Sequence, residues 1–212
     1  MNNTKKFPLR TQKARSTRQR ILGVATELFL AMGYSQTSLE KVATEAQTTK
    51  PTVYSHFKSK AGLFEAVINQ HAEQGSVVFK KLLIPTNDPE DDLIRFGDVF
   101  LSFVLSPDQT YWNRLATAEA IAHPEVGEAF YQAGPARAIQ QLTDYVASQA
   151  KAELLEVENP RRAAEQLIGL MLGVDLLQTQ IGKEPPGKSA LKTQCREAVA
   201  IFLAAYGTRT KG

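Results

Sequence analysis

The residues with the clearest chemical potential lie in one short segment, residues 37–57, which reads TSLEKVATEAQTTKPTVYSHF. Apolar residues at helical spacing predict a short helix over about two turns, a break of about three residues, and a second short helix from Thr49. This is the layout of a helix-turn-helix unit. Its second helix has a polar outer face, whose side chains suit base edges and phosphates of a DNA major groove: Lys50, Thr52, Tyr54, Ser55 and His56.

The charge distribution supports a polyanionic partner for this part of the chain. Residues 1–60 hold 11 Lys and Arg against 3 Asp and Glu, whereas residues 61–212 hold 14 against 19. A basic first part followed by an acidic remainder indicates that the first part meets a polyanion. The alternative is a basic, disordered tail with no specific partner.

The elements that must position these residues are all predicted to be helices. Apolar spacing predicts a first helix that ends near Gly33, and Thr37 with Glu40 could form a capping box for the next. Proline near a helix start then recurs at residues 89, 107, 124 and 160. We expect an all-α protein of about nine helices, with a flexible basic tail (1–13), a three-helix DNA-binding domain (14–60) and a helical ligand-binding and dimerisation domain (61–212).

The run GYSQTSLEKVATEAQTTKPTVYSHFKSKAGLFEAV resembles the DNA-binding domain of the TetR family of bacterial transcriptional regulators. The matching features are Thr-Ser before the first short helix, Ala-x-x-Ala within it, Tyr-x-x-Phe ending the second and Lys-x-x-Leu opening the next. Two later runs, HPEVGEAFYQAGPARAIQQL and NPRRAAEQLIGLMLG, are similar to the ligand-binding domain of an AcrR/AefR-like branch. The resemblance implies a homodimer whose two heads reach successive major grooves of a near-palindromic operator.

The resemblance also implies which residues touch double-stranded DNA. We expect Lys50 and Thr52 to face base edges, and Tyr54 and His56 to reach phosphate or a thymine methyl, unless these two pack at the edge of the unit. Phosphate contacts are expected from four further side chains: Arg18, Thr37, Thr49 and Lys60.

One residue departs from the family pattern. Gln47 stands in the turn, where the family usually has glycine. Glycine adopts positive φ without steric cost and glutamine does not, so we expect either a reshaped turn or stored strain.

Residues 182–189, GKEPPGKS, match the phosphate-loop pattern G-x-x-x-x-G-K-[ST]. The context argues against a nucleotide site, because no strand is predicted before the motif and Pro185 and Pro186 have no N–H to donate. A turn between the last two helices is the simpler interpretation. A nucleotide-binding helical enzyme and a protein-interaction module nevertheless remain as alternatives to a DNA-binding regulator.

The last two predicted helices are expected to form the dimer. Residues 167–177 are apolar apart from Asp175 and two glycines, so a helix here must bury more than one face. One face could contact a partner subunit together with the apolar stripe of residues 191–206, as in the resembled family. A wholly internal helix is the alternative.

The middle helices are rich in aromatic residues, a composition more typical of core than of pocket. The family resemblance nevertheless implies an effector cavity for a small, largely apolar molecule. The expected lining residues are Phe100, Phe103, Trp112, Tyr131, Met171, Asp175 and Gln178.

Several classes are excluded by composition. The single cysteine, Cys195, excludes an intramolecular disulfide framework and multi-cysteine metal sites, and no histidine pair has metal-ligand spacing. No cofactor and no catalytic set is expected. The N-terminus lacks the apolar stretch of a secretory signal, and no window approaches the ~20 apolar residues of a membrane span. We expect a bacterial cytoplasmic protein that is associated with the nucleoid when bound to DNA.

Overall fold

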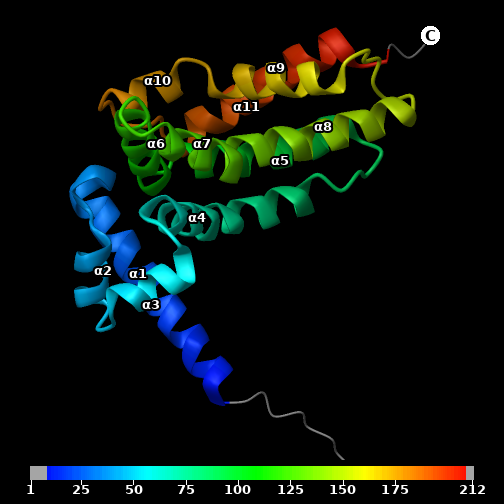
Figure 1. Cartoon of the computed structure of the whole chain (residues 1–212). Coiled ribbons are helices and arrows are strands. Elements are labelled where there is room, and N and C mark those ends of the chain that lie inside the picture. Colours follow the sequence, from blue (N-terminus) through cyan, green and yellow to red (C-terminus); the bar gives the residue numbers. More distant parts are fainter. Residues whose placement is uncertain (1–8, 209–212) are drawn as a thin grey trace, which may run out of the picture. The chain divides into compact units, whose positions relative to one another are not determined.

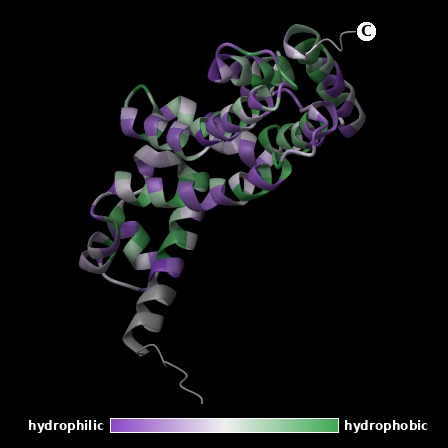
Figure 2. Ribbon diagram, turned by 90° about the vertical axis from the view of Figure 1, so that its right-hand side faces the viewer, coloured by the Kyte–Doolittle hydropathy of each residue, from purple (hydrophilic) through white to green (hydrophobic). Residues whose placement is uncertain are grey.

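The computed structural model describes residues 9–208, and every regular element among them is a helix (Figure 1), as predicted. In chain order the helices are α1 (Leu9–Gln36), α2 (Leu39–Glu45), α3 (Lys50–Phe57), α4 (Lys60–Leu82), α5 (Pro89–Val104), α6 (Pro107–Glu119), α7 (Pro124–Ala133), α8 (Pro135–Lys151), α9 (Pro160–Leu172), α10 (Asp175–Gln180) and α11 (Lys188–Tyr206). Hydrophobic and hydrophilic residues follow one another along the helices (Figure 2), the pattern of amphipathic helices that bury one face.

The chain divides into two compact units, each of which combines two separate stretches of the sequence. Among the described residues, one unit comprises 9–70 together with 115–129, and the other comprises 71–114 together with 130–208. The sequence placed a boundary at residue 60 and did not predict that 115–129 would join the first unit. Of the expected tail, residues 1–8 lie outside the described residues, and residues 9–13 are helical, as part of α1.

The first unit is built on the apolar stripe predicted for the first helix. Ile21, Ala25 and Phe29 of α1 are fully buried, as are Val42 of α2 and Val53 of α3. Regular helix geometry in α1 ends at residue 33, as predicted, because Gly33 has φ 79° and ψ 173°. This region of conformational space is essentially restricted to glycine.

The second unit has an aromatic centre. The ring of Phe79 on α4 lies 5.6–5.7 Å, centroid to centroid, from three rings of α5: Phe96, Phe100 and Phe103. All three contacts are edge-on, the arrangement that aromatic quadrupoles favour. The apolar stripe of residues 191–206 was expected at the dimer contact, but it packs against the core of its own subunit, with Cys195 and Val199 at 0% exposure.

Residues 9–208 contain two more helices than the expected nine, because two backbone breaks are complete. Gly134 ends the helix begun at Pro124, and Pro135 opens α8. Gly173 has φ 48° and separates α9 from α10, so residues 167–177 are not one continuous helix.

A buried carboxylate fixes the start of α5. Asp92 has no exposed surface, and its oxygens accept hydrogen bonds from the Thr86 N–H (3.0 Å), the Thr86 hydroxyl (2.8 Å) and the Tyr145 hydroxyl (2.9 Å). Arg95 also pairs with this carboxylate. Burial and the bond to Asp92 raise the pKa of Tyr145, so the phenol stays protonated and remains a donor.

We expect Cys195 to react with a thiol reagent at pH 8 at least about tenfold more slowly in the native protein than in urea. The side chain is buried, and burial, with a smaller contribution from Asp98, raises the pKa of the thiol to about 12. The reactive thiolate is therefore scarce at pH 8 and increases only as the pH approaches that value. The rate of modification by Ellman's reagent measures this, and equal rates in the two states would contradict the packing.

Within residues 9–208, no helix combines the length and the apolar character that crossing a membrane requires.

Candidate nucleic-acid interface

The turn between α2 and α3 presents one face of α3 to solvent. Val53 and Phe57 are buried, so α3 is anchored on its inner side. Lys50, Tyr54 and Ser55 on the outer side are exposed, Tyr54 by 57%. Thr52 and His56 are partly exposed. The helix therefore offers the polar face that the sequence predicted.

Hydroxyl groups define the starts of both short helices. Thr49 caps α3 as predicted: its Oγ1 accepts from the N–H of Thr52 at 3.3 Å and lies 2.8 Å from the Thr52 hydroxyl. The expected cap on α2 is wrong by one residue, because Ser38 accepts from Lys41 N–H instead. Thr37 is 2% exposed and donates its hydroxyl to the Gly33 carbonyl at 2.8 Å. The non-helical backbone at Gly33 leaves that carbonyl in reach, and the Thr37 hydroxyl is not presented to a ligand.

Cations surround α3, and each has an intramolecular contact. The Arg18 guanidinium lies 5.2 Å from the centroid of the Phe57 ring. Lys60 donates to the Ser35 carbonyl at 3.1 Å and stands 4.4 Å from the centroid of the Tyr34 ring. Burial lowers the pKa of Lys60. The ammonium of Lys50 pairs with the Glu40 carboxylate across the turn.

The turn keeps its ordinary shape and stores strain at Gln47, whose φ is 49°. We expect Gln47→Gly to raise the free energy of unfolding by roughly 0.5–1 kcal/mol, because glycine adopts this φ without a clash between Cβ and the backbone. Urea unfolding followed by circular dichroism measures the change. Thr48→Gly is the matched control: Thr48 has no positive φ, so this variant is expected to lose stability. A loss for both variants would show that Gln47 is unstrained.

A second network in this unit, which sequence reasoning missed, joins the end of α1 to the end of α6 and the start of α7. Glu119 accepts from the Ser35 N–H (3.0 Å) and hydroxyl (2.6 Å), and the Tyr34 hydroxyl donates to Glu125 (3.3 Å). Burial and the Glu125 charge raise the pKa of Tyr34 to about 12. Burial opposes ionisation of Glu119, but the Ser35 hydrogen bonds outweigh it and lower the pKa of that carboxyl. Ser35 and Glu119 are 84 residues apart in sequence, and Tyr34 and Glu125 are 91 apart. No local sequence pattern can therefore predict these hydrogen bonds.

The seven residues expected at the effector site have different surroundings in the structure. Phe100 and Met171 belong to the packed core, at 4% and 0% exposure. Met171 also approaches Gly97 so closely that a Cβ there would lie 2.6 Å from its methyl carbon. Tyr131 is 40% exposed, and Asp175 and Gln178 lie on α10.

Two of the seven do lie together, on either side of His71 of α4. The His71 ring is 6.3 Å from the Phe103 ring and 5.5 Å from the Trp112 ring, centroid to centroid. A ring nitrogen of His71 is 2.9 Å from Gln109 Oε1, and Gln109 in turn donates to Asn113 at 3.3 Å. Aromatic surface and amide groups are therefore combined here in the second unit.

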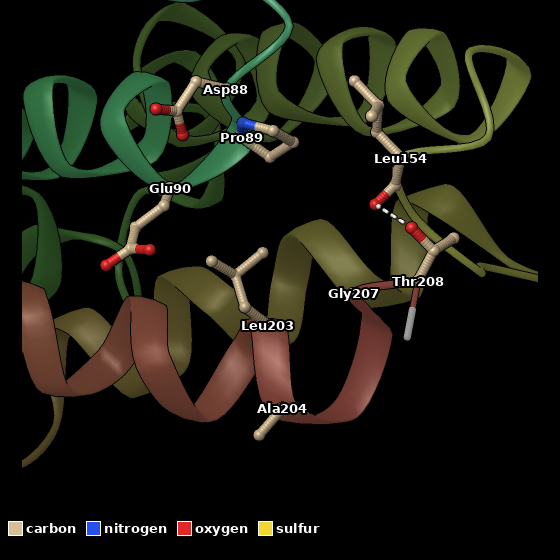
Figure 3. A pocket seen from close by; sticks show the side chains of 8 residues that line it. All are labelled: Asp88, Pro89, Glu90, Leu154, Leu203, Ala204, Gly207 and Thr208. Atoms are coloured by element: carbon tan, nitrogen blue, oxygen red, sulfur yellow. Dashed lines mark hydrogen bonds between the residues drawn. The ribbon is translucent and has the colours of Figure 1, made fainter. Parts of the chain in front are cut away.

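A separate hollow of about 400 Å³ lies at the other end of α5 (Figure 3). Its walls are the start of α5, the turn after α8 and the end of α11, and none of the seven expected residues lines it. The lining residues are Asp88, Pro89, Glu90, Leu154, Leu203, Ala204, Gly207 and Thr208.

The GKEPPGKS segment connects α10 to α11. It follows a helix, and no β-strand occurs in residues 9–208. It therefore lacks the strand–loop–helix setting of a phosphate loop, which supports its interpretation as a turn.

A buried anchor, an exposed polar helix and surrounding cations define a helix-turn-helix DNA-binding protein. Residues 21–67 match the family described as bacterial regulatory proteins, tetR family, and residues 91–208 match the AefR-like transcriptional repressor, C-terminal domain. The chain belongs to the TetR family of transcriptional regulators, whose members are not enzymes.

Individual proteins of known sequence or structure are similar to this chain over nearly its whole length. The transcriptional regulator AcrR of Shigella flexneri is 30% identical, over 92% of this chain and 91% of its own length. A TetR-family regulator from Mesorhizobium loti has a TM-score of 0.80 at 26% identity, covering 92% of this chain and 99% of its own. The flavonoid-responsive regulator FrrA, also at 0.80, is 24% identical and supports the fold, with 92% and 100% coverage.

Proposed function

We propose that this DNA-binding regulator acts as a homodimeric repressor on a near-palindromic operator and leaves it when a small, largely apolar effector binds. The single observation that carries the DNA-binding part is the exposed polar face of α3 on a buried anchor. Two such faces, one from each subunit, would occupy major grooves about one helical turn apart, or a multiple of it. Because chromosomal DNA is the partner, the protein would work in the cytoplasm, at the nucleoid when bound.

In this proposal the side chains have different roles. Lys50 and Thr52 meet base edges, and Tyr54 and His56 reach phosphate or a thymine methyl. Phosphate contacts come from Arg18, Thr49 and Lys60. Thr37 is left out, because its hydroxyl is buried against Gly33.

Two alanine variants separate base reading from phosphate binding. Lys60→Ala is expected to weaken binding to every duplex and to reduce the salt slope by about one unit for each of the two heads. Lys50→Ala is expected to weaken binding and also to relax sequence preference. Titration of an operator and of an unrelated duplex at several salt concentrations measures both effects. Equal effects of the two variants on every sequence would refute the assignment. Since Lys60 also contacts Ser35, thermal unfolding of each variant checks that the unit remains folded.

Dimerisation is assigned to α9, α10 and α11. Large apolar side chains stand exposed on these helices: Leu170 (39%), Val174 (66%), Leu177 (60%), Ile181 (68%) and Ile201 (56%). A row of this kind marks a protein–protein contact, and isologous pairing of two such rows gives a two-fold dimer.

The effector is placed beside His71, Phe103 and Trp112, and Tyr131, Asp175 and Gln178 are kept as candidates on the family resemblance alone. Aromatic walls with a few amide groups suit a largely apolar molecule that carries a hydrogen-bonding group. Among similar structures, FrrA is described as flavonoid-responsive and SmeT of Stenotrophomonas maltophilia forms a triclosan complex. A screen for compounds that release the protein from its operator would test this placement.

A further inference from the structure

Glu40 is an exposed residue in the first turn of α2 and is not part of the packed interior. The sequence suggested that it completes a capping box with Thr37, but Ser38 caps α2 and Thr37 is bonded to Gly33. The Glu40 side chain is exposed, and its carboxylate pairs with the ammonium of Lys50, ten residues later on α3. Bonds from Lys50, with a smaller contribution from Ser38, lower the pKa of Glu40, so it is charged at neutral pH.

The partner of Glu40 is the residue assigned to base reading. The ion pair of Lys50 and Glu40 has no net charge, so it attracts a phosphate less strongly than a free ammonium does. A carboxylate close to the DNA backbone is itself repelled by the phosphates. Exposed ion pairs are weak, so this pair can open where the ammonium and the carboxylate both find new partners. The major groove offers both at once, because guanine O6 and N7 accept from the ammonium and a cytosine amino group donates to the carboxylate, whereas a phosphate offers a partner to the ammonium alone.

We infer that Glu40 is a specificity-determining residue, which withholds Lys50 from phosphate and releases it to the base edges of the correct site. The inference deepens the proposed function and rests on it. Non-specific DNA offers Lys50 mainly phosphate, so pairing with Glu40 weakens that binding. At the operator the base edges replace Glu40, and affinity is maintained. Glu40 is thus a positioning residue that acts through Lys50.

The test is the ratio of non-specific to operator dissociation constants for Glu40→Gln in the full chain. The variant is expected to bind an unrelated duplex about fivefold more tightly and the operator almost unchanged, so the ratio falls by about fivefold. Its salt slope on the unrelated duplex should steepen by about 1.8, one freed cation on each of two heads. Glu45→Gln is the matched control, because Glu45 is an exposed carboxylate at the end of the same helix. It should leave the ratio unchanged.

Three outcomes would overturn the inference. One is an unchanged ratio in Glu40→Gln with normal operator binding by the wild type, which leaves the proposed function intact. Another is the same gain when Glu40→Gln is combined with Lys50→Ala, which would show general charge repulsion rather than action through Lys50. The third is a wild-type protein that prefers no sequence, because the proposed function then fails and the inference fails with it.

Discussion

Leu177→Asp is expected to make the protein monomeric and to lower its affinity for an operator by at least about 100-fold. Leu177 is 60% exposed, and Val174, three residues before it, and Ile181, four residues after it, are exposed by 66% and 68%. A charge placed in such a row cannot be buried against a second copy without a large desolvation cost. A dimer binds its second half-site as an intramolecular event, which raises its operator affinity by a factor of about 10²–10⁴ over that of one head. A monomer lacks this gain in affinity, so its operator binding is weaker.

Sedimentation equilibrium and operator titration measure the two effects. Ile121→Asp is the matched control: Ile121 is an apolar residue with 93% exposure in the turn between α6 and α7, outside the proposed dimer surface. This control introduces the same negative charge and is expected to leave mass and affinity unchanged. If the Leu177→Asp protein stayed dimeric and kept wild-type affinity, the dimer interface would not be formed by α9–α11.

Asp92→Ala is expected to lower the free energy of unfolding of the second unit by about 3 kcal/mol or more. The carboxylate is fully buried, and three donors of Thr86 and Tyr145 point at it. Its removal leaves the Tyr145 hydroxyl and the Thr86 N–H without an acceptor and the Arg95 charge without its nearest partner. Tyr145 is buried, so water cannot replace the acceptor that its hydroxyl loses, whereas the exposed Thr86 and Arg95 lose only the bond itself.

Urea unfolding followed by circular dichroism measures this loss. Asp91→Ala is the control, because Asp91 is exposed and its carboxylate lies 2.8 Å from Arg95. An exposed pair contributes less than about 1 kcal/mol, so the control should be much less destabilised. Similar losses for the two variants would mean that the buried network does not hold the start of α5.

The sequence was most informative where local chemistry decides the structure. Proline at residues 89, 107, 124 and 160 starts a helix in each case, and Thr49 caps α3 as its type and place suggest. Gln47 was expected either to reshape the turn or to adopt a strained conformation, and its positive φ corresponds to the strained conformation. Helix starts, caps and turn conformations depend on residues within one turn of each other, so sequence alone can reach them.

Distant partners and competing local options were beyond such reasoning. Thr37 and Ser38 are both hydroxyl residues, and the backbone at Gly33 decides which of them caps α2. The bonds of Tyr34 and Ser35 to Glu125 and Glu119 span more than 80 residues. Apolar periodicity cannot distinguish core from pocket, so the sequence did not predict that Phe100 packs against Phe79 and Phe96 in the aromatic core.

The most direct test of the account is selection of binding sites from a randomised duplex pool at ~0.15 M salt, where weak non-specific binding is suppressed. The account predicts recovery of a two-fold palindrome whose half-sites are about one helical turn apart, or a multiple of it. Such a site would establish a sequence-specific dimer and provide the duplex for every titration described above. Recovery of no motif, or of an asymmetric one, from well-folded protein would contradict the account.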